Sequence, residues 1–264
     1  MPVPPSDPTA TPPSAASYNA WARYYDAVEG DRGPYVDFYA GLVRDGDDAI
    51  CELGCGTGAV LAPVVARLRA AGHPDLRAAG VDGSEEMLAR GRERDPAIAW
   101  IHGDMRAPPL DARYDLVFCA TNTFQVLLRD DDLGAAFAAA RGLLAPGGRF
   151  AFDLYQPNLD WLRQPQHDRP GREVSVDGQR VQVRETARYD EAARVLHLDW
   201  RLVPLGDPGT TLATIGHQIR QYHAADVERL LHAAGLRILE RHGDLDRSPF
   251  HAGSRKQVLV CGAA

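Results

Sequence analysis

The segment from Ala49 to Gly58, AICELGCGTG, constrains the fold of this chain more than any other stretch. Its apolar start predicts a short buried strand, and three glycines at alternate positions then predict a tight turn. The apolar run from Ala59 to Ala62 begins a helix. A strand that passes directly into a helix presents backbone N–H groups at the helix N-terminus, and small residues let a ligand lie against that backbone.

The glycine spacing distinguishes this turn from other nucleotide-binding turns. A dinucleotide site has the pattern G-x-G-x-x-G, and a Walker A loop ends in Gly-Lys-Ser/Thr. This chain has Gly54, Gly56 and Gly58, with Glu52 two residues before the first glycine and no lysine nearby. The acid is placed to meet a positively charged ammonium group. The spacing disfavours an NAD-binding oxidoreductase and leaves an ordinary strand-to-helix turn as the alternative.

Apolar runs of strand length alternate with helical patterns through the first 155 or so residues. The predicted strands after the glycine turn are 76–81, 98–101, 114–120 and 149–154. Two further strands, 236–240 and 256–261, complete the pattern. The alternation predicts an α/β fold with a seven-stranded, Rossmann-like, doubly wound sheet. Ligands of such sheets bind beyond the carboxyl ends of the strands, so Asp82, Asp104 and the loop 121–125 are expected at one edge.

The chain divides into four parts. Residues 1–14 are proline-rich and predict a disordered tail, and residues 15–172 predict the core with lid helices at its N-terminus. Residues 173–222 show β-like alternation with turn signals, which predicts antiparallel strands inserted after strand five as an acceptor lid or dimer element. Residues 223–264 return to the core.

Four motifs together resemble the class I S-adenosylmethionine (SAM)-dependent methyltransferases, and the lid elements are similar to those of the type that tailors sugars and natural products. The motifs are the glycine turn, Val81–Met87, Gly103–Met105 and the strand that begins Tyr114-Asp115. The resemblance implies that the cofactor is SAM and the product S-adenosylhomocysteine (SAH), with no metal. It implies these cofactor-binding residues: Glu52, Gly54, Cys55, Gly56, Gly58, Asp82, Gly83, Met87, Asp104, Met105 and Tyr25.

The resemblance also implies a reaction. A nucleophile of a small metabolite, nitrogen or oxygen, attacks the methyl group in line with its bond to sulfur, and proximity supplies much of the rate. Asn122 and Gln125 follow strand four and are expected to orient the acceptor, Tyr25 lies near the methionyl end, and His217 is a candidate base. The alternative for Asn122 and Gln125 is that they satisfy loop polar groups, and for His217 that it is an ordinary half-buried strand residue.

The net charge and the cysteine content of the chain limit the binding partners and the cellular location that we expect. The formal net charge of −7 argues against a nucleic-acid partner. The four cysteines lack metal-ligand spacing and fit a cytoplasmic enzyme, and we expect no membrane segment or signal peptide. An exposed edge in the inserted strands would suit a homodimer. The alternatives are a nucleic-acid or protein methyltransferase and a noncatalytic SAM-binding module.

Overall fold

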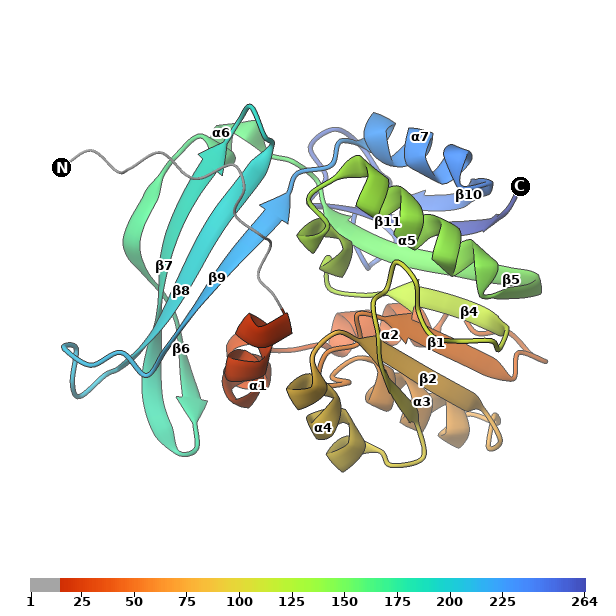
Figure 1. Cartoon of the computed structure of the whole chain (residues 1–264), viewed down its shortest axis with the longest axis horizontal. Helices are drawn as coiled ribbons and strands as arrows, with labels where there is room; N and C mark the ends of the chain where they lie inside the picture. Colours follow the sequence, from red (N-terminus) through yellow and green to blue (C-terminus); the bar gives the residue numbers. More distant parts are fainter. Residues whose placement is uncertain (1–14) are drawn as a thin grey trace.

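The chain forms two β-sheets with a helix between them. The computed structural model describes residues 15–264, and the predicted N-terminal tail lies outside this range. Figure 1 shows a mixed α/β body on the right and a separate four-stranded sheet on the left, with helix α1 between their lower ends. None of the helices formed by residues 15–264 has the length and apolar character needed to span a membrane.

The larger sheet has the predicted Rossmann-like architecture, so that prediction is confirmed. Its seven strands run in the order β10-β11-β5-β4-β1-β2-β3. The neighbours from β3 to β5 pair in parallel, and β11 pairs antiparallel with both β5 and β10. The strands are β1 (Ala49–Leu53), β2 (Arg77–Asp82), β3 (Ala99–His102), β4 (Tyr114–Cys119), β5 (Leu144–Tyr155), β10 (Leu236–His242) and β11 (Lys256–Ala263).

Helices cover both faces of this sheet, so its central strands are buried on both sides. One face packs against α5 (Asp130–Gly142) and α7 (Ala224–Ala233), where Phe137 and Leu231 are buried. The other packs against α2 (Gly33–Ala40), α3 (Leu61–Ala70) and α4 (Glu85–Arg94), where Leu61 and Leu88 are buried. Complete burial of such a side chain stabilises the fold by about 1.5–3 kcal/mol. This doubly covered sheet gives the site a rigid base.

The four-stranded sheet is antiparallel, in the order β6-β7-β8-β9. Its strands are β6 (Gln166–Val176), β7 (Gln179–Asp190), β8 (Val195–Pro204) and β9 (Ala213–Arg220). The insertion therefore begins at Gln166 rather than at Glu173, and the expected boundary at 172/173 falls inside β6. This strand is difficult to recognise in the sequence because Pro170 and Gly171 interrupt the alternation of apolar and polar residues. The pairing of β6 with β7 shifts register at the same place.

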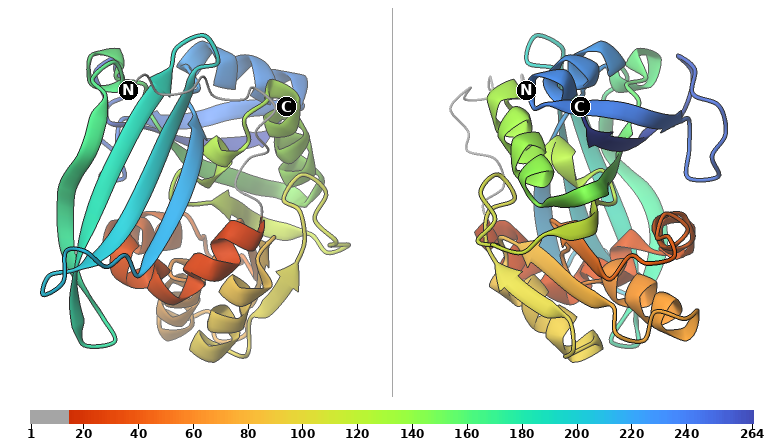
Figure 2. Two further views of the ribbon diagram at one scale, coloured as in Figure 1. Left: turned by 60° about the vertical axis from the view of Figure 1, so that its left-hand side comes forward. Right: turned by 90° about the vertical axis from the view of Figure 1, so that its right-hand side faces the viewer.

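Helix α1 (Ala15–Glu29) attaches the inserted sheet to the core. Trp21 and Val28 are buried against the inserted sheet, in a cluster that includes Val181 and Ile215. Figure 2 shows α1 crossing behind the lower half of this sheet. Two short helical segments complete the fold, η1 (Thr123–Val126) after β4 and α6 (Leu159–Leu162) before β6. Both lie next to the cavity described below.

Candidate active site

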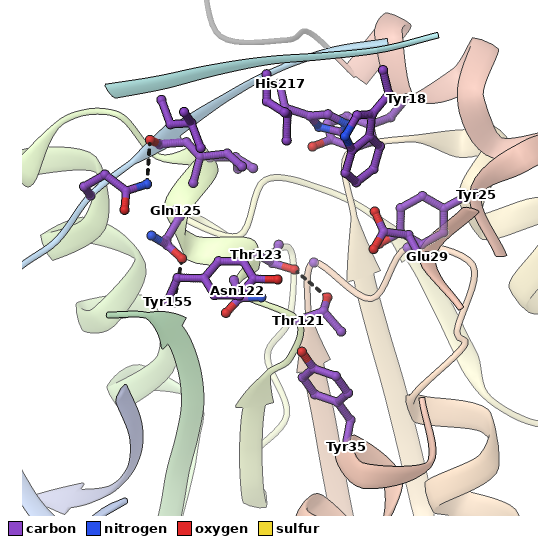
Figure 3. A pocket seen from close by; sticks show the side chains of 18 of the residues that line it. Tyr18, Tyr25, Glu29, Tyr35, Thr121, Asn122, Thr123, Gln125, Tyr155 and His217 are labelled. Atoms are coloured by element: carbon purple, nitrogen blue, oxygen red, sulfur yellow. Dashed lines mark hydrogen bonds between the residues drawn. The ribbon is translucent and has the colours of Figure 1, made fainter. Parts of the chain in front are cut away.

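A cavity of about 800 Å³ lies between the two sheets, beyond the carboxyl ends of the core strands. The glycine turn and the loops after β2, β4 and β5 form its core side, and β7, β8 and β9 form its lid side. In Figure 3, Tyr25 and Glu29 lie on one side, His217 and Tyr18 lie near the inserted strands, and Asn122 and Tyr155 lie opposite. The cavity therefore collects residues from both ends of the chain.

The glycine turn has two distinct roles. All three glycines have positive φ values, +68° at Gly54, +53° at Gly56 and +73° at Gly58, which other residues rarely adopt. Gly54 and Gly56 line the cavity. Gly58 does not line the cavity and instead packs against Trp100. A Cβ at Gly58 would lie 2.2 Å from Cη2 of that ring. Gly58 therefore allows the turn to pack on the core, and Cys55 is likewise buried against Gly80 of β2.

Asp82 fixes the shape of the turn and faces the cavity. Its carboxylate accepts hydrogen bonds from the backbone N–H of Gly56 and of Ser84, both at 2.8 Å. Burial raises the pKa of Asp82, and these backbone hydrogen bonds oppose the increase. Asp82 and Gly83 line the cavity at the end of β2, where the resemblance to the methyltransferases implies that a carboxylate accepts hydrogen bonds from the cofactor ribose.

Glu52 is a buried acid with an unpaired oxygen. It is 2% exposed, and its Oε2 has no hydrogen-bond partner among residues 15–264. Burial and the nearby Asp82 charge raise its pKa well above the ordinary value. A buried unpaired carboxylate is costly and is relieved by a cation. Glu52 does not line the cavity, but Gly54, two residues further on, does, so Glu52 would meet an ammonium group of the predicted cofactor through the turn or through water.

The resemblance implies that Met87, Asp104 and Met105 contact the adenine of the cofactor, but only two of these three residues line the cavity. Met87 and Met105 line the cavity. Asp104 is not among the lining residues, and Arg106 binds its carboxylate through both Nε and Nη2. This ion pair lowers the pKa of Asp104. Its contact with an adenine amino group remains a prediction, which requires the carboxylate to share its oxygens with Arg106.

Tyr25 reaches the glycine turn from helix α1. A Cβ on Gly56 would lie 3.8 Å from Cε1 of the Tyr25 ring. The next residue, Asp26, accepts a 2.6 Å hydrogen bond from Oγ1 of Thr57 in the turn itself. The helix is thus attached to the turn. Trp21 packs in a buried cluster, while Tyr25 lines the cavity.

Asn122 and Gln125 both line the cavity. Both ends of the Gln125 amide are hydrogen-bonded, whereas in Asn122 only the amide oxygen is. The Gln125 amide donates to the carbonyl of Arg220 at 2.9 Å and accepts from the N–H of Tyr155 at 2.8 Å. Gln125 therefore joins the ends of β9 and β5. Asn122 accepts a 2.7 Å hydrogen bond from Nζ of Lys256 through Oδ1. Acceptor orientation by either residue remains a prediction, and the structure favours Asn122.

His217 lies on the lid side among aromatic rings. It is 8% exposed, its ring centroid is 4.8 Å from that of Trp200, and its Nε2 has no partner among residues 15–264. Burial lowers its pKa to about 4. A neutral imidazole therefore faces the cavity at ordinary pH, and it is a weak base. Glu185 and Trp200 are directly opposed on β7 and β8 and line the same wall.

Sequence reasoning missed several residues at this site. Glu29 and Arg32 line the cavity, 3.3 Å apart between carboxylate and guanidinium, and Tyr35 follows them. Glu29 ends α1, Arg32 directly precedes α2 and Tyr35 lies on α2. Their position depends on how these two helices pack, which no local pattern encodes. For Lys256 the sequence does offer a signal, because it is the only lysine of the chain. Among residues 15–264, no three His, Cys, Asp or Glu side chains are grouped so as to hold a metal ion.

Comparison with known proteins agrees with this geometry. Residues 50–148 match the family described as a methyltransferase domain. The dTDP-3-amino-3,4,6-trideoxy-alpha-D-glucopyranose N,N-dimethyltransferase of Streptomyces venezuelae is 27% identical over 72% of this chain and 76% of its own. The dTDP-3-amino-3,6-dideoxy-alpha-D-glucopyranose N,N-dimethyltransferase of Streptomyces fradiae is 28% identical over 82% and 84%. The CcbJ methyltransferase structure from Streptomyces caelestis has a TM-score of 0.73 at 26% identity, and the match covers 91% of this chain and all of that one.

The fold, the glycine turn and these matches define a SAM-dependent transferase. The chain belongs to the class I SAM-dependent methyltransferases, within the type that methylates small molecules. The cavity fits the cofactor because Gly54 and Gly56 leave backbone exposed to it, while Glu52 supplies an unpaired buried acid. When bound, SAM supplies an electrophilic methyl group on a sulfonium centre.

Proposed function

We propose that this enzyme transfers the SAM methyl group to the nitrogen of a small amine, such as an amino sugar of a natural product. The observation that carries the proposal is the combination of carboxylates and aromatic rings around the cavity. Glu29 and Glu185 line it, paired with Arg32 at 3.3 Å and with Arg169 at 3.1 Å, together with the rings of Tyr18, Tyr25 and Trp200. Carboxylates and the faces of aromatic rings both attract a cationic amine.

The cationic residues of the cavity support nitrogen over a carboxylate oxygen as the nucleophile. Arg32 and Arg255 line the cavity, and each lies beside an acid, at 3.3 Å from Glu29 and at 3.6 Å from Asp244. A polycarboxylate acceptor would require uncommitted guanidinium groups. The buried guanidinium, that of Arg32 at 12% exposure, is bound to Glu29, whereas the side chain of Arg255 is 80% exposed, so a nitrogen nucleophile fits the enclosed part of the cavity better.

An amine must lose its proton before it attacks a methyl group. The neutral imidazole of His217 suits a hydrogen bond to the acceptor, and its pKa of about 4 makes it a poor site for storing a proton. We infer that the proton leaves to solvent while the cavity walls hold the nitrogen near the methyl group. Holding the two reactants together can supply about 7–11 kcal/mol of the barrier reduction.

Two of the curated relatives support an amino-sugar acceptor, whereas four others are named as trans-aconitate 2-methyltransferases. The two curated relatives described above are named as N,N-dimethyltransferases of dTDP-linked 3-amino sugars. Their matches extend over 72% and 82% of this chain. We propose that residues 166–222 form the acceptor lid, since this sheet contributes Glu185, Trp200 and His217 to the cavity.

An acceptor panel tests the proposal. Purified enzyme with methyl-labelled SAM is given amino sugars, hydroxylated sugars and polycarboxylates of similar size. We expect label in the amino sugars, with a rate that rises with pH as the free amine forms. Label confined to carboxylates or hydroxyls would overturn the assignment to nitrogen.

Two further proposals concern the protein as a whole. A cytoplasmic location is supported by the four cysteines, which are all free and buried. A homodimer that pairs through β6 is supported by the position of this strand at the edge of its sheet. Light scattering tests the dimer, and a monomer at micromolar concentration would rule it out.

A further inference from the structure

The only lysine of the chain lies directly behind the cavity wall, within a buried hydrogen-bond network. The side chain of Lys256 is 4% exposed, and that of its partner Asp153 is fully buried. Nζ of Lys256 lies 2.6 Å from Oδ2 of Asp153 and 2.7 Å from Oδ1 of Asn122. The ammonium also lies 5.2 Å and 4.6 Å from the ring centroids of Tyr35 and Tyr155, which line the cavity.

The same network holds the turn that follows β4. Thr121 and Asn122 both have positive φ values, 61° and 59°, a conformation that costs a non-glycine residue free energy. The other oxygen of Asp153, Oδ1, accepts from the Thr121 N–H at 2.9 Å and from the Tyr39 hydroxyl at 3.0 Å. Asp153 and Lys256 therefore bind two successive residues of one left-handed turn.

The chemistry of lysine decides which way the Asn122 amide points. An ammonium group has hydrogen-bond donors and no acceptor, so only the oxygen of the amide can face it. The Nδ2 group of Asn122 is left with two N–H donors, and among residues 15–264 no hydrogen bond uses them. Since Asn122 lines the cavity, these donors are available to a bound molecule.

We propose that Lys256 is a positioning residue for the methyl acceptor: it orients Asn122 so that the amide N–H groups bind an oxygen of the acceptor next to the nitrogen that is methylated. The inference rests on the proposed amine methylation. It specifies the acceptor further, as a 3-amino sugar with a hydroxyl at C4; the hydroxyl at C2, on the other side of the amino carbon, is present in both sugars named below. Gln125 cannot take this role, since both ends of its amide are bound to the main chain.

Two probe molecules differ in the group that matters. The dTDP-3-amino-3,6-dideoxy and dTDP-3-amino-3,4,6-trideoxy sugars are the acceptors in the names of the two relatives, and only the first has a hydroxyl at C4, beside the amino carbon. We expect wild-type enzyme to favour the hydroxylated sugar about tenfold in kcat/KM, the usual contribution of one neutral hydrogen bond. Asn122→Ala should lower kcat/KM for the hydroxylated sugar about tenfold more than kcat/KM for the trideoxy sugar, so that the preference between the two is lost. SAH affinity should not change.

Variants at Lys256 test the positioning itself. Lys256→Met combined with Asp153→Asn removes both buried charges and keeps an amide oxygen for Thr121 and Tyr39, so the turn is retained. This double variant should show no preference between the two sugars. The single variant Lys256→Arg, which keeps a cation beside Asp153, should retain part of the wild-type preference. Arg149→Met is the matched control, because Arg149 lies on the same strand, four positions before Asp153, and forms a buried ion pair with Asp47, separate from that of Lys256. It should lower the melting temperature and keep the preference.

The outcomes separate the inference from the proposed function. If wild-type enzyme methylates neither sugar nor any other amine, the proposed function fails and the inference fails with it. If wild-type enzyme methylates both sugars but Asn122→Ala or the double variant keeps the wild-type preference, the inference alone is overturned. It is also overturned if Asn122→Ala weakens SAH binding, since the amide would then serve the cofactor.

Discussion

Substitution of Glu52 by glutamine should stabilise the ligand-free enzyme and at the same time weaken its binding of SAH. Glu52 is buried, one of its oxygens is unpaired, and its pKa is raised well above the ordinary 4.5. Glutamine has nearly the same shape and no charge. The change therefore removes a cost from the empty site and removes the anion that we expect the cofactor ammonium to meet.

The sign and slope of the effect follow from proton linkage. Below pH 4.5, Glu52 is protonated in both the folded and the unfolded chain and its titration costs nothing. As the pH rises above this value, the unfolded chain ionises first while the folded chain keeps the proton. The stability of the wild type relative to the variant then falls by about 1.4 kcal/mol per pH unit until the folded pKa is reached.

Urea unfolding of ligand-free wild type and Glu52→Gln at several pH values measures this difference directly. Glu93→Gln serves as control because Glu93 is exposed on α4. SAH titration by calorimetry provides the second measurement, where loss of one charged contact should weaken binding about 10- to 100-fold. A stability difference that does not vary with pH, or unchanged SAH affinity, would refute the reasoning.

Three other substitutions test separate parts of the structure. Gly58→Ala should cost about 2–4 kcal/mol in urea unfolding because of its positive φ and the tryptophan packed against it, whereas Gly142→Ala, with open space around it, should cost nothing. Thr57→Val removes the hydrogen bond to Asp26 and should lower stability by about 1.5–3 kcal/mol, and an unchanged melting temperature would argue against this attachment of α1. His217→Gln should leave the pH profile of kcat/KM unchanged above about pH 5, because the wild-type imidazole is already neutral there; loss of an ionisation near neutral pH would contradict this.

The core fold could be predicted because its signals are local. Each strand of the larger sheet that follows the glycine turn is a short apolar run, and the turn residues mark where the strands end. Strand β6 was placed too late, since Pro170 and Gly171 break the alternation by which a strand is identified. A bulged edge strand keeps its backbone pairing without keeping the sequence pattern.

The site could be predicted only in part. Gly54, Gly56 and Asp82 line the cavity, and they could be predicted because a strand-to-helix turn fixes their positions locally. The carboxylate of Asp104 is hydrogen-bonded to the guanidinium of Arg106, a residue that lies just outside the motif Gly103–Met105. The antiparallel pairing of β11 with β5 brings Lys256 next to Asp153 across 103 positions of sequence, and no short motif encodes such a contact.

The two predicted amides illustrate the same limit. Asn122 and Gln125 lie three residues apart in one loop, and the sequence gives no reason to prefer either. Their difference arises from partners far away in the chain, Lys256 for one and the carbonyl of Arg220 for the other. Local pattern therefore identified the loop, and only tertiary contacts show which amide remains available to a ligand.

The most direct test of the central claim is a mass-spectrometric count of the products formed from SAM and a 3-amino sugar. We expect one SAH for each methyl group that appears on nitrogen, with both products reduced together in Glu52→Gln at limiting SAM. An enzyme that binds SAH but forms neither product with any amine would contradict the account.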